Sequence, residues 1–193
     1  KAAAAGSKEQ YNYDETDADS VTVYVTVSND GIPLQGNDPD KTALSHLKVT
    51  VPYFDLKDYG LERFYRYHTA DGKGSYVDET VVKRPTLLHL YIYLLQKYCM
   101  NKPTTPENNP QKYPLSGRIN YMNGTEAYIV TDGFALNATQ TATSMYMTSF
   151  WGRGENLMYY RNHVYPLMGP GWGSTADYIL LSDNDTIDLA MFT

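Results

Sequence analysis

An alternating pattern of hydrophobic and polar residues predicts two strands near the start of the chain. Residues 21–28 read VTVYVTVS, so every second position is valine and the positions between them carry hydroxyl groups. A strict period of two is typical of a half-buried strand. The Asn29-Asp30-Gly31 sequence that follows favours a hairpin turn, because these residues tolerate positive φ. Residues 47–52 alternate in the same way, so we expect a second strand that returns beside the first.

A helical period appears in the middle of the chain. Apolar residues recur there at spacings of three and four, at Leu87, Leu90, Tyr91, Leu94, Leu95 and Tyr98. This spacing is typical of a helix with one buried face. Pro85 precedes the segment, and Asn101 and Pro103 are suited to end it. We therefore expect one long helix over residues 86–100.

Further strands are predicted in the second half of the chain. Asn123-Gly124 favours a hairpin within the polar residues 116–144. The expected strands cover residues 128–130, 145–150, 157–160, 178–181 and 186–192. We expect the last two of them to pair around the turn at residues 182–185. Several hairpins with one long helix indicate the α+β class.

Three segments show no regular pattern. Residues 1–20 begin with the linker-like KAAAAGS and become acid-rich, so we interpret them as a linker or lead-in. Residues 53–79 are aromatic and charged with three glycines, which predicts a long irregular excursion. Residues 101–114 contain four prolines, and this loop could divide the chain into two lobes near residues 101–115. The expected organisation is a single domain over residues 21–193.

Composition places the chain among globular proteins. Of its 193 residues, 42% are hydrophobic and 20% are charged, which argues against wholesale disorder and against a coiled coil. No apolar run reaches the roughly 20 residues of a membrane span. The excess of 22 acidic over 16 basic residues disfavours nucleic acid as a partner, because such binding relies on clustered Lys and Arg. The single cysteine, Cys99, fits both a cytosolic protein and a bacterial surface protein that avoids disulfides.

Motifs of catalysis and metal binding are missing from the sequence. It contains no Gly-x-Ser-x-Gly, no HExxH and no phosphate-binding loop. Its four histidines are dispersed and are interpreted as structural: His46, His68, His89 and His163. Asp183, Asp185 and Asp188 could hold calcium, but the EF-hand pattern is incomplete, and a polar turn before a strand is the favoured interpretation. We expect no enzymatic activity, no cofactor and no bound metal.

Tyrosine is the most unusual feature of the composition. The chain has 19 Tyr, 2 Trp and 5 Phe, and such rings suit binding surfaces because they combine a rigid apolar face with a polar tip. Tyr159 and Tyr160 are neighbours on an expected strand, so one of them must leave the core face. Glycine-rich turns are expected to push Trp151 and Trp172 outward. The predicted ligand-binding residues are these rings, further aromatic residues and their polar neighbours: Trp151, Trp172, Tyr159, Tyr160, Arg153, Asn156, Asn162, Tyr65, Tyr67, Lys73 and Tyr76. For any single tyrosine, simple packing of the sheet and helix stays an alternative.

The last fifty residues resemble a known family. In chain order they contain a strand with Trp151, a Tyr160-x-Asn162 segment, a glycine-rich crossing to Asp177, and a polar turn at residues 183–187 before the last strand. This order is similar to that of the transcobalamin C-terminal-like domain of surface proteins in Gram-positive bacteria. Two departures are visible: Asn184 stands where the family has glycine, and residues 53–76 and 101–144 exceed the compact family core.

The resemblance implies a β-grasp fold, in which a mixed sheet wraps across one helix, with irregular aromatic-rich insertions that set ligand specificity. It also implies an extracellular place on the surface of a Gram-positive gut bacterium, beside other domains of a larger protein. From this context and the aromatic residues we expect a noncatalytic carbohydrate-binding module for a neutral polysaccharide such as starch or another α-glucan. The alternatives are a domain that binds cobalamin or another corrinoid, and a structural adhesive domain.

Overall fold

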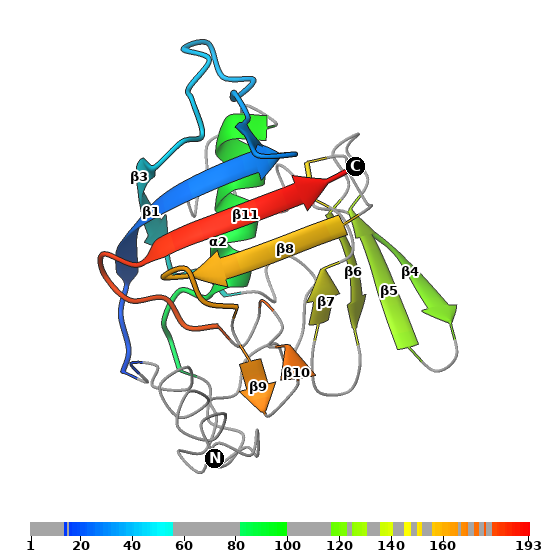
Figure 1. The fold of residues 1–193 in the computed structure, drawn as a ribbon. Coiled ribbons are helices and arrows are strands. Elements are labelled where there is room, and N and C mark those ends of the chain that lie inside the picture. Colours follow the sequence, from blue (N-terminus) through cyan, green and yellow to red (C-terminus); the bar gives the residue numbers. More distant parts are fainter. Residues whose placement is uncertain are drawn as a thin grey trace, which may run out of the picture.

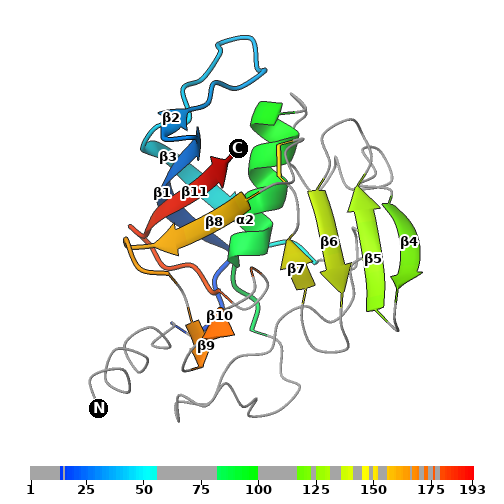
Figure 2. The same cartoon turned by 45° about the vertical axis from the view of Figure 1, so that its right-hand side comes forward.

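The main sheet of the molecule has five strands and mixed directions. The computed structural model describes residues 14, 16–55, 82–99, 117–122, 125–130, 136–140, 145–147, 150–151, 156–165, 167–169, 172–173, 176 and 179–193. The strands of the main sheet are β1 (Ser20–Asn29), β2 (Ile32–Pro33), β3 (Leu47–Pro52), β8 (Asn156–Arg161) and β11 (Thr186–Phe192). β1 and β11 run parallel in the middle, β8 lies antiparallel beside β11, and β2 and β3 both pair with the other edge of β1 (Figure 1; β2 is labelled in Figure 2).

The first hairpin follows the predicted pattern. The four valines of β1 are buried, and the hydroxyl-bearing residues between them are partly exposed. Asp30 and Gly31 have φ angles of 49° and 79°, the left-handed values that a two-residue hairpin turn requires. β3 then pairs antiparallel with the first half of β1, from Ser20↔Pro52 to Val25↔Leu47. The predicted return of a second strand beside the first is therefore confirmed.

The helix starts at the predicted place but changes character along its length. α2 (Leu87–Leu94) has Thr86 as its N-cap, whose side chain caps His89 while the His89 ring caps the Thr86 backbone. Five residues of π-helix, η2 (Leu95–Cys99), continue it. Asn37 closes the far end, because its backbone and side-chain N–H groups donate to the carbonyl oxygens of Tyr98 and Cys99 at 2.6 and 2.9 Å. These bonds satisfy carbonyl groups that a helix end leaves without an intrahelical donor.

Burial of α2 differs from the prediction of a single buried face. Every residue from Leu87 to Leu94 is buried, the histidine and both tyrosines included. Figure 2 shows the reason: α2 lies between the main sheet and a second set of strands. A helix enclosed on both sides is apolar all round rather than amphipathic, and this setting could not be inferred from the helix's own residues.

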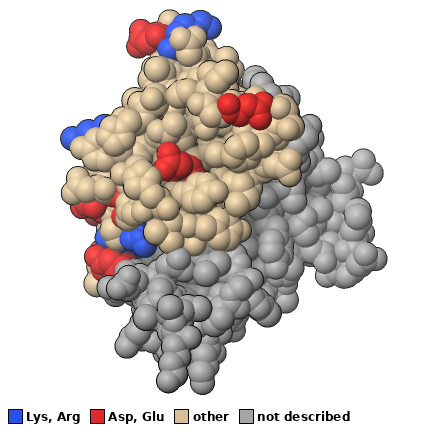
Figure 3. All heavy atoms as spheres, in the orientation of Figure 1, with Lys and Arg blue, Asp and Glu red and all other residues tan. Residues whose placement is uncertain are grey.

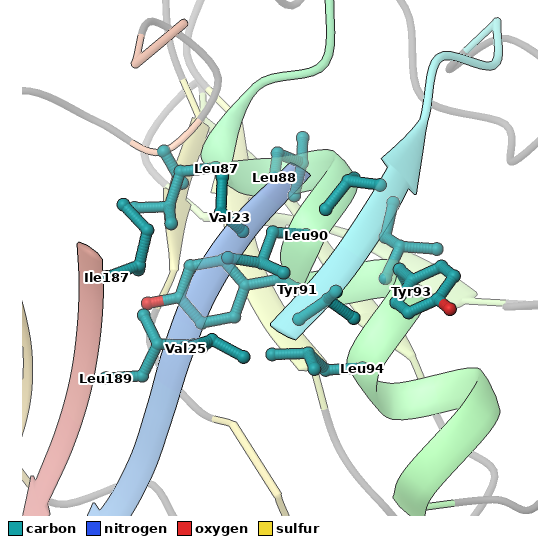
Figure 4. Packing of buried hydrophobic residues seen from close by; sticks show 14 of the residues in the cluster. Val23, Val25, Leu87, Leu88, Leu90, Tyr91, Tyr93, Leu94, Ile187 and Leu189 are labelled. Atoms are coloured by element: carbon teal, nitrogen blue, oxygen red, sulfur yellow. The ribbon is translucent and has the colours of Figure 1, made fainter. Parts of the chain in front are cut away.

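The core lies between α2 and the inner face of the main sheet. Buried side chains of β1, β3 and β11 meet those of α2 in one cluster that also includes Phe150 and residues 179–181. In Figure 4, Tyr91 reaches from α2 toward Val25 and Leu189, so the ring spans the space between helix and sheet. The alternating residues of the strands thus supply one wall of the core, and the other wall is helical.

A second sheet follows the helix in the chain. It consists of β4 (Gly117–Met122), β5 (Thr125–Val130), β6 (Leu136–Gln140) and β7 (Met145–Met147), all antiparallel neighbours in this order. Met122 pairs with Thr125, which confirms the hairpin predicted at residues 123–124. β7 also confirms the strand predicted from residue 145. A short pair, β9 (Leu167–Gly169) and β10 (Trp172–Gly173), completes the strands of the described residues.

The predicted pairing of the last two strands is wrong. β11 does form over Thr186–Phe192, but its partners are β1 and β8. Residues 179–181 lie instead at the start of α2, where the Leu87 N–H donates to the Ile179 carbonyl at 2.9 Å and the Leu181 N–H to the Pro85 carbonyl at 3.0 Å. The apolar residues 179–181 are buried there, so contact with the helix start outweighs local pairing across the turn.

Mixed strands with a helix make the fold α+β, as predicted. Several expectations fall on residues outside the described part: most of the lead-in 1–20, the excursion from residue 56 to 81, and the loop at 101–115. Within the described residues, no helix has the length and apolar character needed to cross a membrane.

Candidate functional site

A tight hairpin turn follows β8 and carries one of the predicted site residues. Asn162 and His163 have φ angles of 51° and 65°, and Arg161 and Val164 exchange two backbone hydrogen bonds of 3.0 Å. Asn162 stabilises the turn with its side chain: its amide nitrogen donates to Asp185 at 2.9 Å, and its amide oxygen accepts from the Thr186 N–H at 2.8 Å. Both ends of this amide are thus used to fix the hairpin against β11.

Asp185 is the buried centre of the turn before β11. Its carboxylate accepts from Arg161 Nε at 2.7 Å and from the Ser182 N–H at 2.8 Å, besides Asn162. Asp183 accepts from the Thr22 N–H at 2.8 Å and so ties the same turn to β1. No group of three or more His, Cys, Asp or Glu in the described part of the chain could hold a metal ion. These contacts make residues 182–185 a polar turn that is tied to β1 and β8.

Asn184 has a backbone conformation that few residues adopt. Its φ angle is 68°, in the left-handed region that favours glycine and that asparagine tolerates better than most other residues. Asparagine at this position therefore keeps the backbone conformation for which a glycine would also be suited.

Three tyrosines form a cluster at the β8 edge of the main sheet. Tyr165 stacks on Tyr159, with ring centroids 5.8 Å apart, and meets Tyr160 edge-on at 6.3 Å. Tyr159 is the cross-strand partner of Leu189, and Tyr160 is the partner of Asp188. Because cross-strand partners share a face of the sheet, Tyr159 lies on the core face, where it packs against the buried cluster. Tyr160 lies on the opposite face, so the prediction that one of the two leaves the core is confirmed.

Trp151 packs closer to the core than predicted. It is only partly exposed and contacts the buried cluster, with its ring 5.7 Å from that of Phe150. The prediction that its turn pushes the ring outward is therefore wrong in this respect, because Phe150 anchors it inward. Its backbone has a φ of 59°, which is uncommon for a bulky residue and costs of the order of 1–3 kcal/mol. Such strain is found most often at functional sites.

A buried hydroxyl group lies behind these rings. Tyr91 is fully buried with its ring edge-on to Phe150 at 4.7 Å, and among the described residues its hydroxyl oxygen has no hydrogen-bond partner. Burial raises the pKa of Tyr91 well above its usual value, and the neighbouring Tyr159 and Tyr165 raise it further. The rings of the tyrosine cluster therefore continue into the core as far as Tyr91, whose hydroxyl group is uncharged.

The structure describes only some of the remaining predicted site residues. Asn156 is exposed at the start of β8 and, by its register with Phe192, lies on the same face as Tyr160. Trp172 lies in β10, and its side chain is outside what the structure describes. The other predicted residues also fall outside the described part: Arg153, Tyr65, Tyr67, Lys73 and Tyr76. The structure thus brings Asn156 and Tyr160 onto one face and places Tyr159 on the other.

Asn156 and Tyr160 lie on the face of the main sheet that points away from α2. We call it the open face and define it by the alternate residues of three strands: 22, 24, 26 and 28 of β1, 186, 188, 190 and 192 of β11, and 156, 158 and 160 of β8. Figure 3 views this face and shows it largely uncharged, with isolated acidic and basic groups. Phe192 is 41% exposed there.

The chemistry offered by the open face is that of rings, hydroxyl groups and amides. No family model, curated protein or solved structure matches the chain. Because one fold can host many functions, the side chains of the open face are what point to a function. Rings beside neutral hydrogen-bonding groups can hold a ligand that has an apolar surface and many hydroxyl groups, and they need no metal or charged partner to do so.

Sequence reasoning missed Tyr165, which joins the two β8 tyrosines into one cluster. Tyr165 follows a turn and belongs to no periodic segment, so no local pattern separates it from the other tyrosines of the chain. It also missed Tyr24, although a signal existed. The period of two in residues 21–28 already places Tyr24 opposite the buried valines, and therefore on the partly exposed side of the strand.

Proposed function

We propose that this chain is a noncatalytic carbohydrate-binding module that holds a neutral polysaccharide, with starch or another α-glucan as the first candidate ligand. The observation that carries the proposal is the Tyr160 ring on the largely uncharged open face of the sheet, which Tyr165 contacts edge-on from the sheet edge. Tyr165 supports the Tyr160 ring from the side, so Tyr160 is presented as an ordered surface and loses little rotamer entropy on binding.

Sugars suit this surface for a simple chemical reason. A pyranose ring offers C–H groups that pack on a tyrosine face, and its hydroxyl groups exchange hydrogen bonds with neutral side chains. Asn156 lies on the same face of β8 as Tyr160 and is exposed, so it can serve such hydroxyl groups. An uncharged ligand needs no charged partner on a surface with few charges. A polyanion would instead be repelled by a chain of net charge −6.

The scaffold of the proposed module is a β-grasp domain of the transcobalamin C-terminal-like kind. In support, the strand order β3-β1-β11-β8 has a parallel central pair, with an antiparallel hairpin on one side and α2 across the inner face. The hairpin after Tyr160 and the turn at Asp185 are further features that support this proposal. The proposed setting is the surface of a Gram-positive gut bacterium, within a larger protein of several domains.

Affinity electrophoresis against a panel of polysaccharides tests this proposal. Purified protein should be retarded in gels that contain soluble starch and run normally in gels with carboxymethyl cellulose, which is anionic. The double variant Tyr160→Ala/Tyr165→Ala should run in starch as it does without polysaccharide, while a circular dichroism spectrum checks that it is folded.

Two parallel measurements separate the alternatives. Titration with cyanocobalamin should leave the intrinsic fluorescence unchanged, and saturable quenching would instead favour a corrinoid-binding domain. Incubation with starch should release no reducing sugar, and release by pure protein would show an enzyme. Failure to bind any polysaccharide of the panel would leave the adhesive role as the better explanation.

A further inference from the structure

A pair of stacked rings lies on the open face, away from the tyrosine cluster. Tyr24 of β1 stacks on His46, with ring centroids 4.8 Å apart and ring planes only 13° from parallel. Tyr24 is partly exposed and His46 is exposed. Neither side chain belongs to the buried cluster, so packing of the core does not account for the pair.

The backbone of His46 is held in place to make this stack. Its φ angle is 47°, a left-handed value in which histidine occurs more often than most residues but still rarely. The His46 N–H donates to Thr26 Oγ1 at 2.9 Å, and Thr26 is the next residue after Tyr24 on the open face of β1. One strand therefore positions both the ring of the pair and the hydroxyl group that fixes its partner.

The two ring pairs are aligned across the sheet. Thr26 of β1 pairs with Asp188 of β11, and Asp188 pairs with Tyr160 of β8. Tyr24 lies two residues before Thr26, so two strand spacings and two residues separate Tyr24 from Tyr160. With strands about 4.8 Å apart and about 3.4 Å per residue, their Cα atoms lie about 12 Å apart. This distance exceeds the width of a single pyranose ring.

We propose that the Tyr24–His46 pair is a second sugar-binding position, and that together with Tyr160 it selects a chain of linked glucose units over a single sugar. The inference rests on the proposed carbohydrate-binding function. A chain that crosses β1, β11 and β8 places one sugar on each ring pair and a linking sugar above the row formed by Thr26 and Asp188. The hydroxyl and carboxylate groups of this row are suited to accept or donate hydrogen bonds to that linking sugar.

Charge on the face favours a neutral chain as the occupant. Among the described residues, the charged groups beside the proposed path are Lys48, which is the cross-strand partner of Tyr24, and Asp188, which lies 3.6 Å from His163. These opposite charges, one beside Tyr24 and one in the middle of the path, would attract one part of a polyanion or polycation and repel another. A neutral α-glucan meets no such conflict, and each glucose unit has the same faces for both ring pairs.

Isothermal titration of the full chain with glucose, maltose and maltoheptaose, together with affinity electrophoresis in soluble starch, tests the inference. The wild type should bind maltoheptaose at least about tenfold more tightly than maltose, because two separated ring pairs add binding energy only for a ligand that spans them. Tyr24→Ala and, separately, His46→Ala should each weaken maltoheptaose binding about tenfold. Neither variant should change the affinity for maltose by more than about twofold, since Tyr160 remains for a short ligand.

Matched controls keep these outcomes interpretable. Tyr24→Phe retains the stacked ring and should bind as the wild type does, and Thr50→Ala changes an exposed residue of β3 on the same side of the sheet. Urea unfolding of each variant shows whether it is folded. If the wild type binds maltoheptaose but Tyr24→Ala and His46→Ala bind it equally well, the second position is refuted while the proposed function stands. If the wild type binds neither starch nor maltoheptaose, both are refuted.

Discussion

The two faces of the main sheet are built from alternate residues of the same strands, yet they have opposite characters. On the face toward α2, the side chains of Val25, Ile187 and Leu189 are fully buried. On the open face, their immediate neighbours Tyr24, Thr26 and Asp188 are partly exposed and polar or aromatic. One residue along a strand is thus enough to pass from the core to a surface suited to binding.

This difference teaches that stability and recognition are encoded separately along one strand. Substitutions on the inner face should change the free energy of unfolding, and those on the open face should change ligand affinity. A pair of neighbouring residues, one from each face, is therefore the sharpest way to test the division.

Leu189→Ala should show the largest effect on stability. Leu189 is fully buried in the centre of β11, and truncation of a buried leucine costs about 2–5 kcal/mol because apolar contacts are lost and a cavity remains. Urea denaturation followed by circular dichroism measures this loss. Glycan affinity, measured well below the melting temperature, should stay unchanged. A loss under about 1 kcal/mol would contradict the assignment of this face to the core.

Much of the fold could be predicted because its signals are local. The valine alternation and the Asn-Asp-Gly turn placed β1 and the hairpin with β3, and Pro85 with the leucine spacing placed the start of α2. The pairing of β11 could not be predicted in this way. Its parallel neighbour β1 is more than 150 residues away in the sequence, whereas residues 178–181 lie close by across a turn and look like a natural partner.

Asp185→Ala should have the second largest effect. The substitution removes an acceptor for Arg161, Asn162 and the Ser182 N–H, and the side chains of Arg161 and Asp185 are only 16% and 6% exposed. Breaking a buried charge pair by removing one partner costs about 3–5 kcal/mol when burial is complete, so about 3 kcal/mol is expected here. Thermal melting measures it. Asp183→Ala, which removes a contact of an exposed carboxylate, is the control and should cost less.

His89 should make the inner side of the molecule sensitive to acid. Burial lowers the pKa of His89 from 6.5 to about 4, against smaller opposing effects of the Phe54 carbonyl and Asp55. Between pH 6.5 and 4 the unfolded chain therefore takes up a proton that the folded protein does not. The free energy of unfolding should fall by about 3 kcal/mol over this range, and this contribution is fully present only above pH 6.5.

Urea denaturation as a function of pH tests this expectation with His89→Gln as the matched variant. Glutamine at this position can still accept from the Thr86 N–H, which His89 Nδ1 does at 3.0 Å. The variant should lose the slope between pH 6.5 and 4 and keep the steeper loss below pH 4 that arises from carboxylates such as Asp14, whose pKa its bond with Thr16 lowers. An unchanged slope in the variant would assign the acid sensitivity to other groups.

The candidate site was predicted in part, because strands rich in aromatic residues can be recognised in a sequence. The face of the sheet on which a residue lies, and the residues that it contacts, cannot be recognised in this way. The pair Tyr159-Tyr160 was predicted, and strand alternation required that the two separate. Which of them leaves the core depends on the register with β11, a contact between distant segments. Asn162 was predicted as a ligand contact because of its residue type, but its amide is bound to Asp185 and Thr186. No sequence signal pointed to His46, since its place in the ring pair depends on its left-handed backbone conformation and on its contact with Tyr24 of β1.

Tyr160→Ala and Tyr159→Ala should separate the two faces at the level of one dipeptide. Tyr160→Ala should weaken starch binding about tenfold, or about 1.4 kcal/mol, and change the free energy of unfolding little, because the ring lies on the open face. Tyr159→Ala should do the reverse, since Tyr159 packs against the core cluster and stacks on Tyr165. Affinity electrophoresis and urea denaturation of both variants measure the two effects. Equal losses of affinity would mean that the site includes the sheet edge and is not confined to the open face.

Asp188→Asn should have the smallest effect on stability of all. Asp188 faces His163 at 3.6 Å, with side-chain exposures of 33% and 79%. An exposed pair of this kind contributes about 0–1 kcal/mol, because water screens the charges and both side chains lose freedom when they pair. We expect a change below about 0.5 kcal/mol in urea denaturation. Asp185→Asn, a substitution of the same type three residues earlier, is the control and should cost clearly more, because that carboxylate is buried and bound to Arg161. If the two variants lost equal stability, Asp188 would belong to the hydrogen-bond network of the turn. Its carboxylate on the open face would then stabilise the fold as much as the buried carboxylate of Asp185 does.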